Sequence, residues 1–313
     1  MIRVLKKKNM LGKKSKKDSK IIANMLSEVK KISPAKINLY LEIINKRSDG
    51  YHNLESLMSF CDFGDVISVK KSNVFQLDIV GQFSKNLISK DNIIVETIEK
   101  LQDFFDREFK VYVKLTKNLP ISSGMAGGSS NAATLIRAII DLYKLKIEKE
   151  RINELLISIG SDVPFCFFGK TALVQGKGEK VNFFSKGIPE FFVLLANPRQ
   201  QISTKKIFER LEIKSVKRKM NSLDYSSDEN FVQHIKNRKN DLEIPAIKQC
   251  KKISYLLDFF NSHTDCLFSR MTGSGATCFA VFQTNKKLIN AEKILREKFK
   301  NYWIQKTKIV NEI

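Results

Sequence analysis

The sequence Leu119-Pro-Ile-Ser-Ser-Gly-Met-Ala-Gly-Gly-Ser-Ser-Asn-Ala-Ala133 is a loop rich in glycine and serine, and it decides the fold. Strand-like residues 109–115 precede it, and apolar residues at helical spacing predict a helix over about 130–143. Glycine lets a backbone approach a ligand closely and adopt positive φ. A helix start adds free N–H groups and a positive dipole end. We therefore expect this loop to bind phosphate.

Two familiar nucleotide-binding patterns do not fit this loop. No Gly-Lys-Ser/Thr ends it, so it is not a Walker A loop, and the spacing of Gly124, Gly127 and Gly128 differs from the Rossmann fingerprint. A purely structural interpretation also stands, namely a strand–helix turn with Ser129 or Ser130 as the N-cap.

Upstream of the loop, residues 32–44 alternate between apolar and polar side chains. This alternation predicts a strand with Lys36, Asn38 and Tyr40 on one polar face. Further predicted elements are a turn at 48–50, a strand at 65–70 and a helix at 87–105.

Downstream, a predicted helix over 150–159 is expected to end at a left-handed Gly160. Glycines at 176, 178 and 187 mark loops and a domain boundary. Residues 211–252 are polar, rich in lysine, and either helical or loop-like. The other predicted elements are strands at 191–196 and 278–282 and a helix at 288–299.

The composition is strongly basic. The 313 residues include 55 Lys and Arg against 33 Asp and Glu, which gives a net charge of +22. Such a charge attracts phosphates, nucleic acid or anionic membranes without selecting among them, and an AT-rich coding bias explains it equally well. The five cysteines are widely separated without a CxxC pair, which argues against a disulfide framework or structural zinc. No apolar run approaches the roughly 18 residues of a membrane span.

The first 32 residues carry eleven basic side chains against Asp18 and Glu28 only. We interpret residues 1–32 as a basic, disordered extension. Transit peptides are usually rich in Arg and Ser, whereas this segment is rich in Lys. We therefore expect a cytoplasmic protein, with a plastid location as the alternative.

Three segments in order resemble the motifs of the GHMP kinases. They are Ser33-Pro-Ala-Lys-Ile-Asn-Leu39, the loop from Pro120 to Ala133, and Met271-Thr-Gly-Ser-Gly-Ala276. The resemblance implies an α+β fold of two domains, with an N-terminal domain similar to domain 2 of ribosomal protein S5 at 33–186. A ferredoxin-like C-terminal α/β sandwich would occupy 187–313, and ATP would bind in the cleft between the domains.

The resemblance also implies roles for individual residues. Asp162, within Gly160-Ser-Asp-Val-Pro-Phe165, would accept the proton of the acceptor hydroxyl, and Lys36 would lie beside it. Without the resemblance, Asp162 is equally explained as the N-cap of the turn that follows it. Lys36 is equally explained as a solvated lysine on a strand. ATP would arrive with Mg²⁺, touched by Ser129 or Ser130. The expected ATP-binding residues are Pro120, Ser122, Ser123, Gly124, Met125, Ala126, Gly127, Gly128, Ser129, Ser130 and Asn131.

The segment Arg47-Ser-Asp-Gly-Tyr-His52 resembles the branch of the family that phosphorylates a cytidine diphosphate derivative of methylerythritol. Tyr51 and His52 would contact the cytosine, with Asn38 nearby. The second glycine loop would close over phosphates through Gly273, Ser274, Gly275 and Ala276. The resemblance thus implies a small-molecule substrate, no membrane or obligatory nucleic acid, and a monomer or homodimer.

Two other functions stay open at this point. A kinase for another alcohol, such as homoserine or mevalonate, would share the three motifs but has no use for the Asp-Gly-Tyr-His turn. A nucleic-acid-binding protein would explain the net charge and would bind with a steep salt dependence.

The phosphate loop departs from the family in one respect. Ser122, Ser123 and Ala126 stand where the family often has glycine, and residues with a Cβ atom resist positive φ. This departure bears on the conformation of the loop and on ATP affinity.

Overall fold

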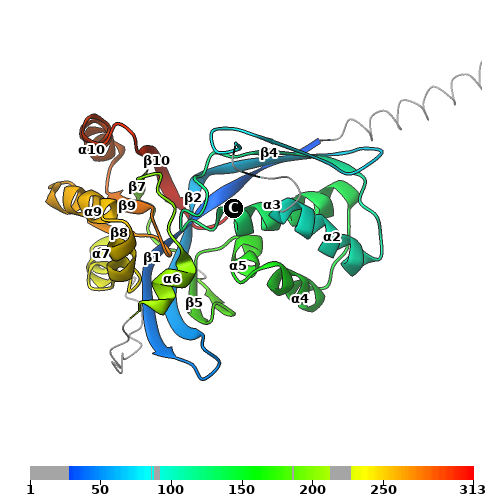
Figure 1. The fold of residues 1–313 in the computed structure, drawn as a ribbon, viewed down its shortest axis with the longest axis horizontal. Coiled ribbons are helices and arrows are strands. Elements are labelled where there is room, and N and C mark those ends of the chain that lie inside the picture. The colour runs from blue at the N-terminus through cyan, green and yellow to red at the C-terminus, as the bar shows by residue number, and fades with distance from the viewer. Residues whose placement is uncertain (1–27, 86, 88–91, 185–186, 212–226) are drawn as a thin grey trace, which may run out of the picture.

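The computed structural model describes residues 28–85, 87, 92–184, 187–211 and 227–313. These residues form a ten-stranded sheet, with helices packed against it in two groups (Figure 1). The strands are β1 (Glu28–Lys46), β2 (His52–Lys71), β3 (Gln76–Val80), β4 (Val111–Thr116), β5 (Ala172–Gly176), β6 (Lys180–Phe183), β7 (Phe192–Asn197), β8 (Phe268–Met271), β9 (Cys278–Phe282) and β10 (Trp303–Val310). The helices are α2 (Ile93–Phe105), α3 (Gly127–Tyr143), α4 (Lys149–Ile159), α5 (Val163–Phe168), α6 (Thr204–Glu209), α7 (Asp228–Lys236), α8 (Glu243–Gln249), α9 (Lys252–Ser262) and α10 (Asn285–Lys298).

The long hairpin of β1 and β2 organises the sheet. Strand β2 pairs with β1, β4, β5 and β10, and β10 pairs in turn with β7. Figure 1 shows α2 to α5 on one side of this hairpin and α7, α9 and α10 on the other. The last strand of the chain therefore joins the two halves of the sheet.

Each half has its own hydrophobic core. One core packs α2, α3 and α4 against β2 and β4, and a second packs α8, α9 and α10 against β7 and β9. A third core lies where the halves meet, and it contains Ile37 of β1, Met125 of the phosphate loop and Trp303 of β10. Burial of these apolar side chains, at roughly 25 cal/mol per Å² of apolar surface, holds the loop between the two halves.

The predicted strand at 32–44 is confirmed, and it is longer than predicted. It begins at Glu28, so residues 28–32 are strand rather than extension, while residues 1–27 lie outside the described residues. Its predicted polar face is buried: Lys36, Asn38 and Tyr40 expose only 4%, 0% and 1% of their surface. The interpretation of Lys36 as a solvated lysine is therefore wrong, because its ammonium group is held against Asn38 and Asp162 and its backbone against Met125 of the phosphate loop.

The helix after the phosphate loop begins at Gly127, three residues earlier than predicted. Its N-cap is Ala126, which adopts φ +51°, and among the described residues no side chain caps this end. Neither Ser129 nor Ser130 is therefore the N-cap. Helix α4 ends at Gly160 as predicted, but with φ 172° this glycine is extended rather than left-handed.

The predicted helix over 87–105 begins at Ile93, where the side chain of Asn92 accepts the N–H of Ile94 as an N-cap. Residues 88–91 lie outside the described residues, as do 185–186 at the predicted domain boundary. The division at 186/187 stays a prediction. Among the helices that the structure describes, none has both the length and the apolar character needed to cross a bilayer.

Candidate active site

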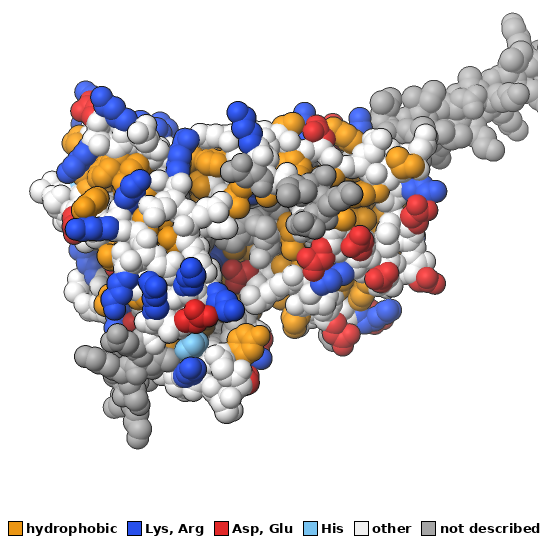
Figure 2. Space-filling view, in the orientation of Figure 1, with side chains coloured by type: hydrophobic (Ala, Val, Ile, Leu, Met, Phe, Trp, Pro, Cys, Tyr) orange, Lys and Arg blue, Asp and Glu red, His pale blue; other side chains and the backbone are white. Residues whose placement is uncertain are grey.

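A cleft of about 2060 Å³ opens between the two halves of the molecule. Strand β1, the phosphate loop, the start of α5, the second glycine loop and α6 all contribute to its walls. Figure 2 shows Lys and Arg side chains spread over the part that holds α6 to α10, with most of the visible Asp and Glu side chains on the opposite part.

Asp162 and Lys36 meet inside this cleft. Asp162 occupies the N-cap position of α5, yet its carboxylate makes no capping hydrogen bond to the described residues. It lies instead with Oδ2 3.5 Å from Lys36 Nζ. The Lys36 side chain is 5% exposed and that of Asp162 is 32% exposed. The carboxylate is thus open to a ligand, whereas the buried lysine is fixed beside it.

Lys36 is held by β1 and by the phosphate loop together. Its Nζ donates to Asn38 Oδ1 at 2.9 Å, and its backbone N–H donates to the carbonyl of Met125 at 3.1 Å. Asn38 Nδ2 donates in turn to Ser56 Oγ at 2.8 Å. The backbone N–H of Asn38 donates to Thr272 Oγ1, in the second glycine loop, at 3.0 Å. The ammonium group therefore has a fixed position relative to both loops.

The phosphate loop adopts left-handed conformations at two residues that are not glycine. Ser122 and Ala126 both have φ +51°, and Gly124 has φ +78°. Each such residue with a Cβ atom costs roughly 1–2 kcal/mol. The loop therefore keeps a glycine-like path at Ser122 and Ala126 despite their side chains, at a cost in conformational strain.

The two glycine loops touch backbone to backbone. A Cβ atom on Gly124 would lie 2.3 Å from the carbonyl oxygen of Thr272, and one on Gly273 would lie 2.5 Å from that of Gly124. The N–H of Thr277 also donates to the carbonyl of Ser123 at 3.3 Å. Only glycine permits this approach, so the two loops form one continuous floor of the cleft.

Comparison with known proteins identifies this arrangement. Residues 92–170 match the model of the GHMP kinases N terminal domain, and residues 213–301 match that of the GHMP kinases C terminal domain. The chain is 33% identical over 278 residues to 4-diphosphocytidyl-2-C-methyl-D-erythritol kinase of Chelativorans sp. (strain BNC1), covering 88% of this chain and 94% of that protein. This chain belongs to the GHMP kinase family.

Other relatives agree with this family. The kinase of the same name from Clostridioides difficile (strain 630) is 31% identical over 276 residues, covering 87% of this chain and 93% of the relative. A crystal structure of 4-(cytidine 5'-diphospho)-2C-methyl-D-erythritol kinase superposes with a TM-score of 0.73 at 21% identity, covering 90% of this chain and 99% of that one. A crystal structure of homoserine kinase from Cytophaga hutchinsonii ATCC 33406 superposes with a TM-score of 0.70 at 14% identity, covering 92% of this chain and 96% of that one. The predicted α+β GHMP kinase fold is confirmed.

In this GHMP kinase most of the predicted site residues line the cleft. The structure brings together Lys36, Asn38, Tyr51, His52, Pro120, Ser122, Ser123, Gly124, Ala126, Gly127, Gly128, Ser129, Asn131, Asp162, Gly273 and Ser274. Four predicted residues are absent from the described lining, namely Met125, Ser130, Gly275 and Ala276. Met125 and Ala276 are fully buried, and Ser130 Oγ accepts the hydroxyl of Ser33 at 3.0 Å. These residues support the loops from behind.

Lys117 is a cleft residue that the motifs did not indicate. It is buried, forms an ion pair with Asp65, and its Nζ would lie 3.4 Å from a Cβ atom on Gly127. Asp65 Oδ1 also accepts the N–H groups of Asn118 and Leu119, at 2.7 and 2.9 Å. A cation is thus fixed at the start of α3. Its position directly before the Asn-Leu-Pro of the loop is the sequence signal that could have found it.

Phe208 was also missed, because the short helix α6 has no motif. Its ring centroid lies 5.3 Å from that of His52, with 32° between the rings. Tyr51 is exposed nearby, and Lys177 Nζ lies 5.1 Å from its ring centroid. Burial, together with the charge of Lys46, lowers the pKa of His52, so this imidazole stays neutral near pH 7.

Proposed function

We propose that this chain transfers the γ-phosphate of ATP to the 2-hydroxyl of 4-diphosphocytidyl-2-C-methyl-D-erythritol. The products are ADP and the 2-phosphate, in the non-mevalonate route to isoprenoids. The observation that carries the proposal is the open carboxylate of Asp162, 3.5 Å from a buried Lys36 and in one cleft with both glycine loops. Relatives with this activity in their name, 33% identical over nearly their whole length, support the choice of substrate.

The chemistry follows from the charges in the cleft. Asp162 accepts the proton of the acceptor hydroxyl while the hydroxyl oxygen forms a bond to the γ-phosphorus. The bond between the γ-phosphorus and the bridging oxygen then breaks, and that oxygen leaves with ADP. Lys36 stabilises the negative charge on the transferring group. Phosphoryl transfer depends on such positioning and charge stabilisation more than on covalent catalysis, which suits a carboxylate and an ammonium group held at fixed positions.

The start of α3 is suited to the phosphates of ATP. Gly127, Gly128 and Ser129 line the cleft at the N-terminus of this helix. The N-cap residue, Ala126, makes no side-chain hydrogen bond to the N–H groups there. The positive end of a helix dipole and its free N–H groups favour anions. The ion pair of Lys117 and Asp65 lies at the same place and offers the Lys117 ammonium as a donor. We assign this end of the cleft to ATP.

Magnesium would arrive bound to ATP and would neutralise charge on its phosphates. Between the two serines expected near the metal, Ser129 lines the cleft, whereas the Ser130 hydroxyl is buried against Ser33. A hydroxyl oxygen is a hard donor of the kind that Mg²⁺ prefers, and this ion usually keeps few protein ligands. We therefore assign the contact to Ser129 rather than Ser130.

The outer end of the cleft suits a nucleobase. Tyr51, His52 and Phe208 present three aromatic rings there, and aromatic faces stack on bases at roughly 1–3 kcal/mol per base. A neutral imidazole can donate to or accept from a cytosine edge. Homoserine and mevalonate have no aromatic group that could stack on these rings. The three rings therefore favour the cytidine substrate. We further propose that the enzyme acts in the cytoplasm, as a monomer or homodimer.

The test is ADP release by the purified chain with ATP and Mg²⁺, offered the cytidine diphosphate methylerythritol, mevalonate and homoserine in parallel. We expect turnover with the cytidine substrate only. Asp162→Asn should abolish it while leaving ADP binding intact, because the amide keeps the shape but cannot accept the proton. Turnover with mevalonate or homoserine instead would contradict the assignment of the aromatic rings.

A further inference from the structure

Asn240 joins α7 and α8 to the second glycine loop. It is 4% exposed, and its Nδ2 donates to the carbonyls of Met271 and Gly273, at 2.8 Å each. Its Oδ1 accepts the N–H of Leu242 at 3.0 Å. Both polar atoms of this buried side chain are thus committed to backbone groups, and two of the three bonds hold the glycine loop.

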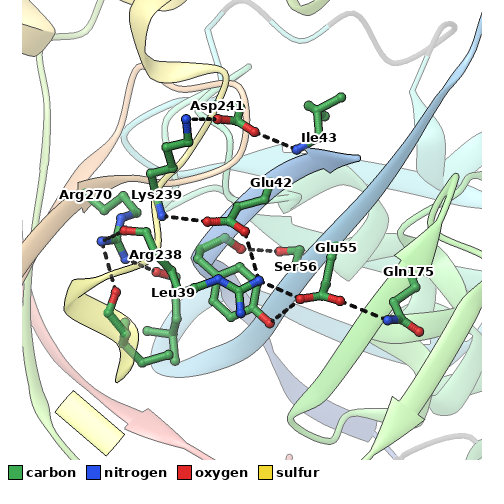
Figure 3. Close-up of polar contacts among 12 residues, drawn as sticks. Leu39, Glu42, Ile43, Glu55, Ser56, Gln175, Arg238, Lys239, Asp241 and Arg270 are labelled. Carbon is green, nitrogen blue, oxygen red and sulfur yellow. Dashed lines mark hydrogen bonds and ion pairs between the residues drawn. The ribbon is translucent and has the colours of Figure 1, made fainter. Parts of the chain in front are cut away.

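The segment around Asn240 is itself fixed to β1. The N–H of Leu41 donates to the carbonyl of Lys239 at 3.0 Å, and the N–H of Asp241 donates back to the carbonyl of Leu41 at 2.8 Å. Asp241 Oδ2 accepts the N–H of Ile43 at 2.7 Å, as Figure 3 shows. The segment therefore pairs with the other edge of β1 at Leu41, three residues beyond Asn38.

Arg238 makes this attachment rigid. Its guanidinium lies 2.9 Å from Glu42 Oε2 and 2.6 Å from Glu55 Oε1, which come from β1 and β2 (Figure 3). The same group lies 3.9 Å from the ring centroid of Tyr40. An arginine held by two carboxylates and an aromatic face leaves little freedom to the backbone beside it. Asn240 thus transmits the position of the hairpin to the glycine loop.

On its other side, the loop that Asn240 holds is linked to Lys36 through Asn38 and touches the phosphate loop. Thr272 Oγ1 accepts the N–H of Asn38, whose side chain accepts from Lys36, and Gly273 touches Gly124 of the phosphate loop. Glu243 Oε2 adds a bond from the N–H of Met271 at 3.1 Å. A shift of residues 271–273 would therefore move the floor of the cleft relative to Lys36.

We propose that Asn240 is a positioning residue for phosphoryl transfer, which keeps the second glycine loop in register with the phosphate loop and Lys36. This inference rests on the proposed function, because it assigns the loop to the transferring or acceptor phosphates. A misplacement of about 1 Å far from the chemistry lowers the rate about 100-fold. The expected loss therefore falls on kcat and on the KM of the acceptor, not on nucleotide affinity.

The test compares Asn240→Asp with Asn311→Asp. Aspartate keeps the shape but turns an acceptor toward the two carbonyls, so both bonds are lost. Asn311 is a matched control, because its amide also bonds backbone N–H and carbonyl groups, both of Ile188 at 2.8 Å, and it is not among the described residues that line the cleft. We measure kcat, both KM values, ADP affinity and melting temperature.

We expect Asn240→Asp to lower kcat about 10- to 100-fold with ADP affinity within about twofold of the wild type, and Asn311→Asp to keep kcat. Asn240→Ser, which can restore one of the two bonds, should give an intermediate kcat, and it carries the test if the aspartate variant does not fold. An unchanged kcat, a parallel loss of ADP affinity, or an equal loss in Asn311→Asp would each overturn the proposal.

A second measurement reports on the mobility of the glycine loop itself. Amide hydrogen exchange over 271–277 should be faster in the Asn240 variants than in Asn311→Asp, and equal exchange contradicts the proposal. Wild-type turnover identifies the acceptor, whereas the ratio of variant to wild-type kcat tests Asn240 with whichever alcohol the wild type phosphorylates.

Discussion

Gly124 and Gly273 lie on two loops about 150 residues apart in sequence, and their backbones touch: a Cβ atom on Gly273 would lie 2.5 Å from the carbonyl oxygen of Gly124. This contact makes the phosphate loop and the second glycine loop a single surface. Lys36 stands beside that surface because Met125 and Thr272 bond to β1 from the two loops, and Asp162 lies 3.5 Å from Lys36.

The contact predicts a large effect of Gly273→Ala. The added methyl group meets backbone at a residue with φ +54°, so both strain and overlap oppose it. Gly50→Ala is the control, because Gly50 has φ +84° but nothing within 4 Å of its Cβ position. Chemical denaturation should show a loss of about 1–2 kcal/mol for Gly50→Ala and at least about 1 kcal/mol more for Gly273→Ala. Equal losses would mean that the loops do not touch.

Ala126→Gly should stabilise the protein. Glycine removes the left-handed strain at φ +51°, and after the added entropy of the unfolded chain a gain of about 0.5–1 kcal/mol remains. Lys144→Gly is the matched control, since Lys144 has φ +53° at the end of α3 and is not among the described cleft residues. Both variants should melt higher, and only Ala126→Gly should change the KM of ATP. Destabilisation by Ala126→Gly alone would contradict the conformation described for the loop.

Arg238→Met should destabilise the protein in a manner that depends on pH. Burial raises the pKa of Glu55, but hydrogen bonds from Arg238 and Gln175 outweigh it and hold this pKa below 4.5. The wild type therefore has this stabilisation above pH 4.5 and loses it as the pH falls through the folded pKa. Arg238→Met removes the cation that lies between the buried carboxylates of Glu42 and Glu55, which costs about 3–5 kcal/mol near pH 7.

The difference in unfolding free energy between Arg238→Met and the wild type should shrink as the pH falls from 7 toward 4, because protonation removes the uncompensated charge. Arg296→Met provides the comparison: its pair with Glu292 is on the surface, with Arg296 51% exposed, and should contribute under about 1 kcal/mol at every pH. A loss for Arg238→Met that is independent of pH would show that packing against Tyr40, rather than charge, dominates.

Lys36→Met should reduce kcat about 10²- to 10³-fold, the usual cost of removing one group that stabilises transition-state charge. Binding of ADP should change little, because the nucleotide phosphates are assigned to the start of α3. Lys31→Met, five residues earlier on the same strand, removes a half-buried lysine that pairs with Asp141 outside the described cleft lining, and it should leave kcat unchanged. The measurement is steady-state kinetics at saturating ATP, and full activity in Lys36→Met would remove this residue from the mechanism.

The sequence by itself determined the local structure and the family. Alternation over 32–44 predicted β1, the glycine loop predicted a helix start near 130, and three motifs in order predicted the GHMP kinase fold. These features can be predicted from the sequence because side-chain periodicity and glycine positions determine the backbone conformation of the few residues around them.

Only the tertiary structure decided which groups meet. Lys36 and Asp162 are 126 positions apart, and Lys36 is buried although the alternation of its strand predicts only a polar face. The same holds for the burial of Ser130 against Ser33, the ring contact of Phe208 with His52, and the bonds of Arg238 and Asn240 within the polar stretch 211–252. The physical reason is that a side chain acquires its partners from packing between segments distant in sequence, whereas periodicity records only the segment in which the side chain lies.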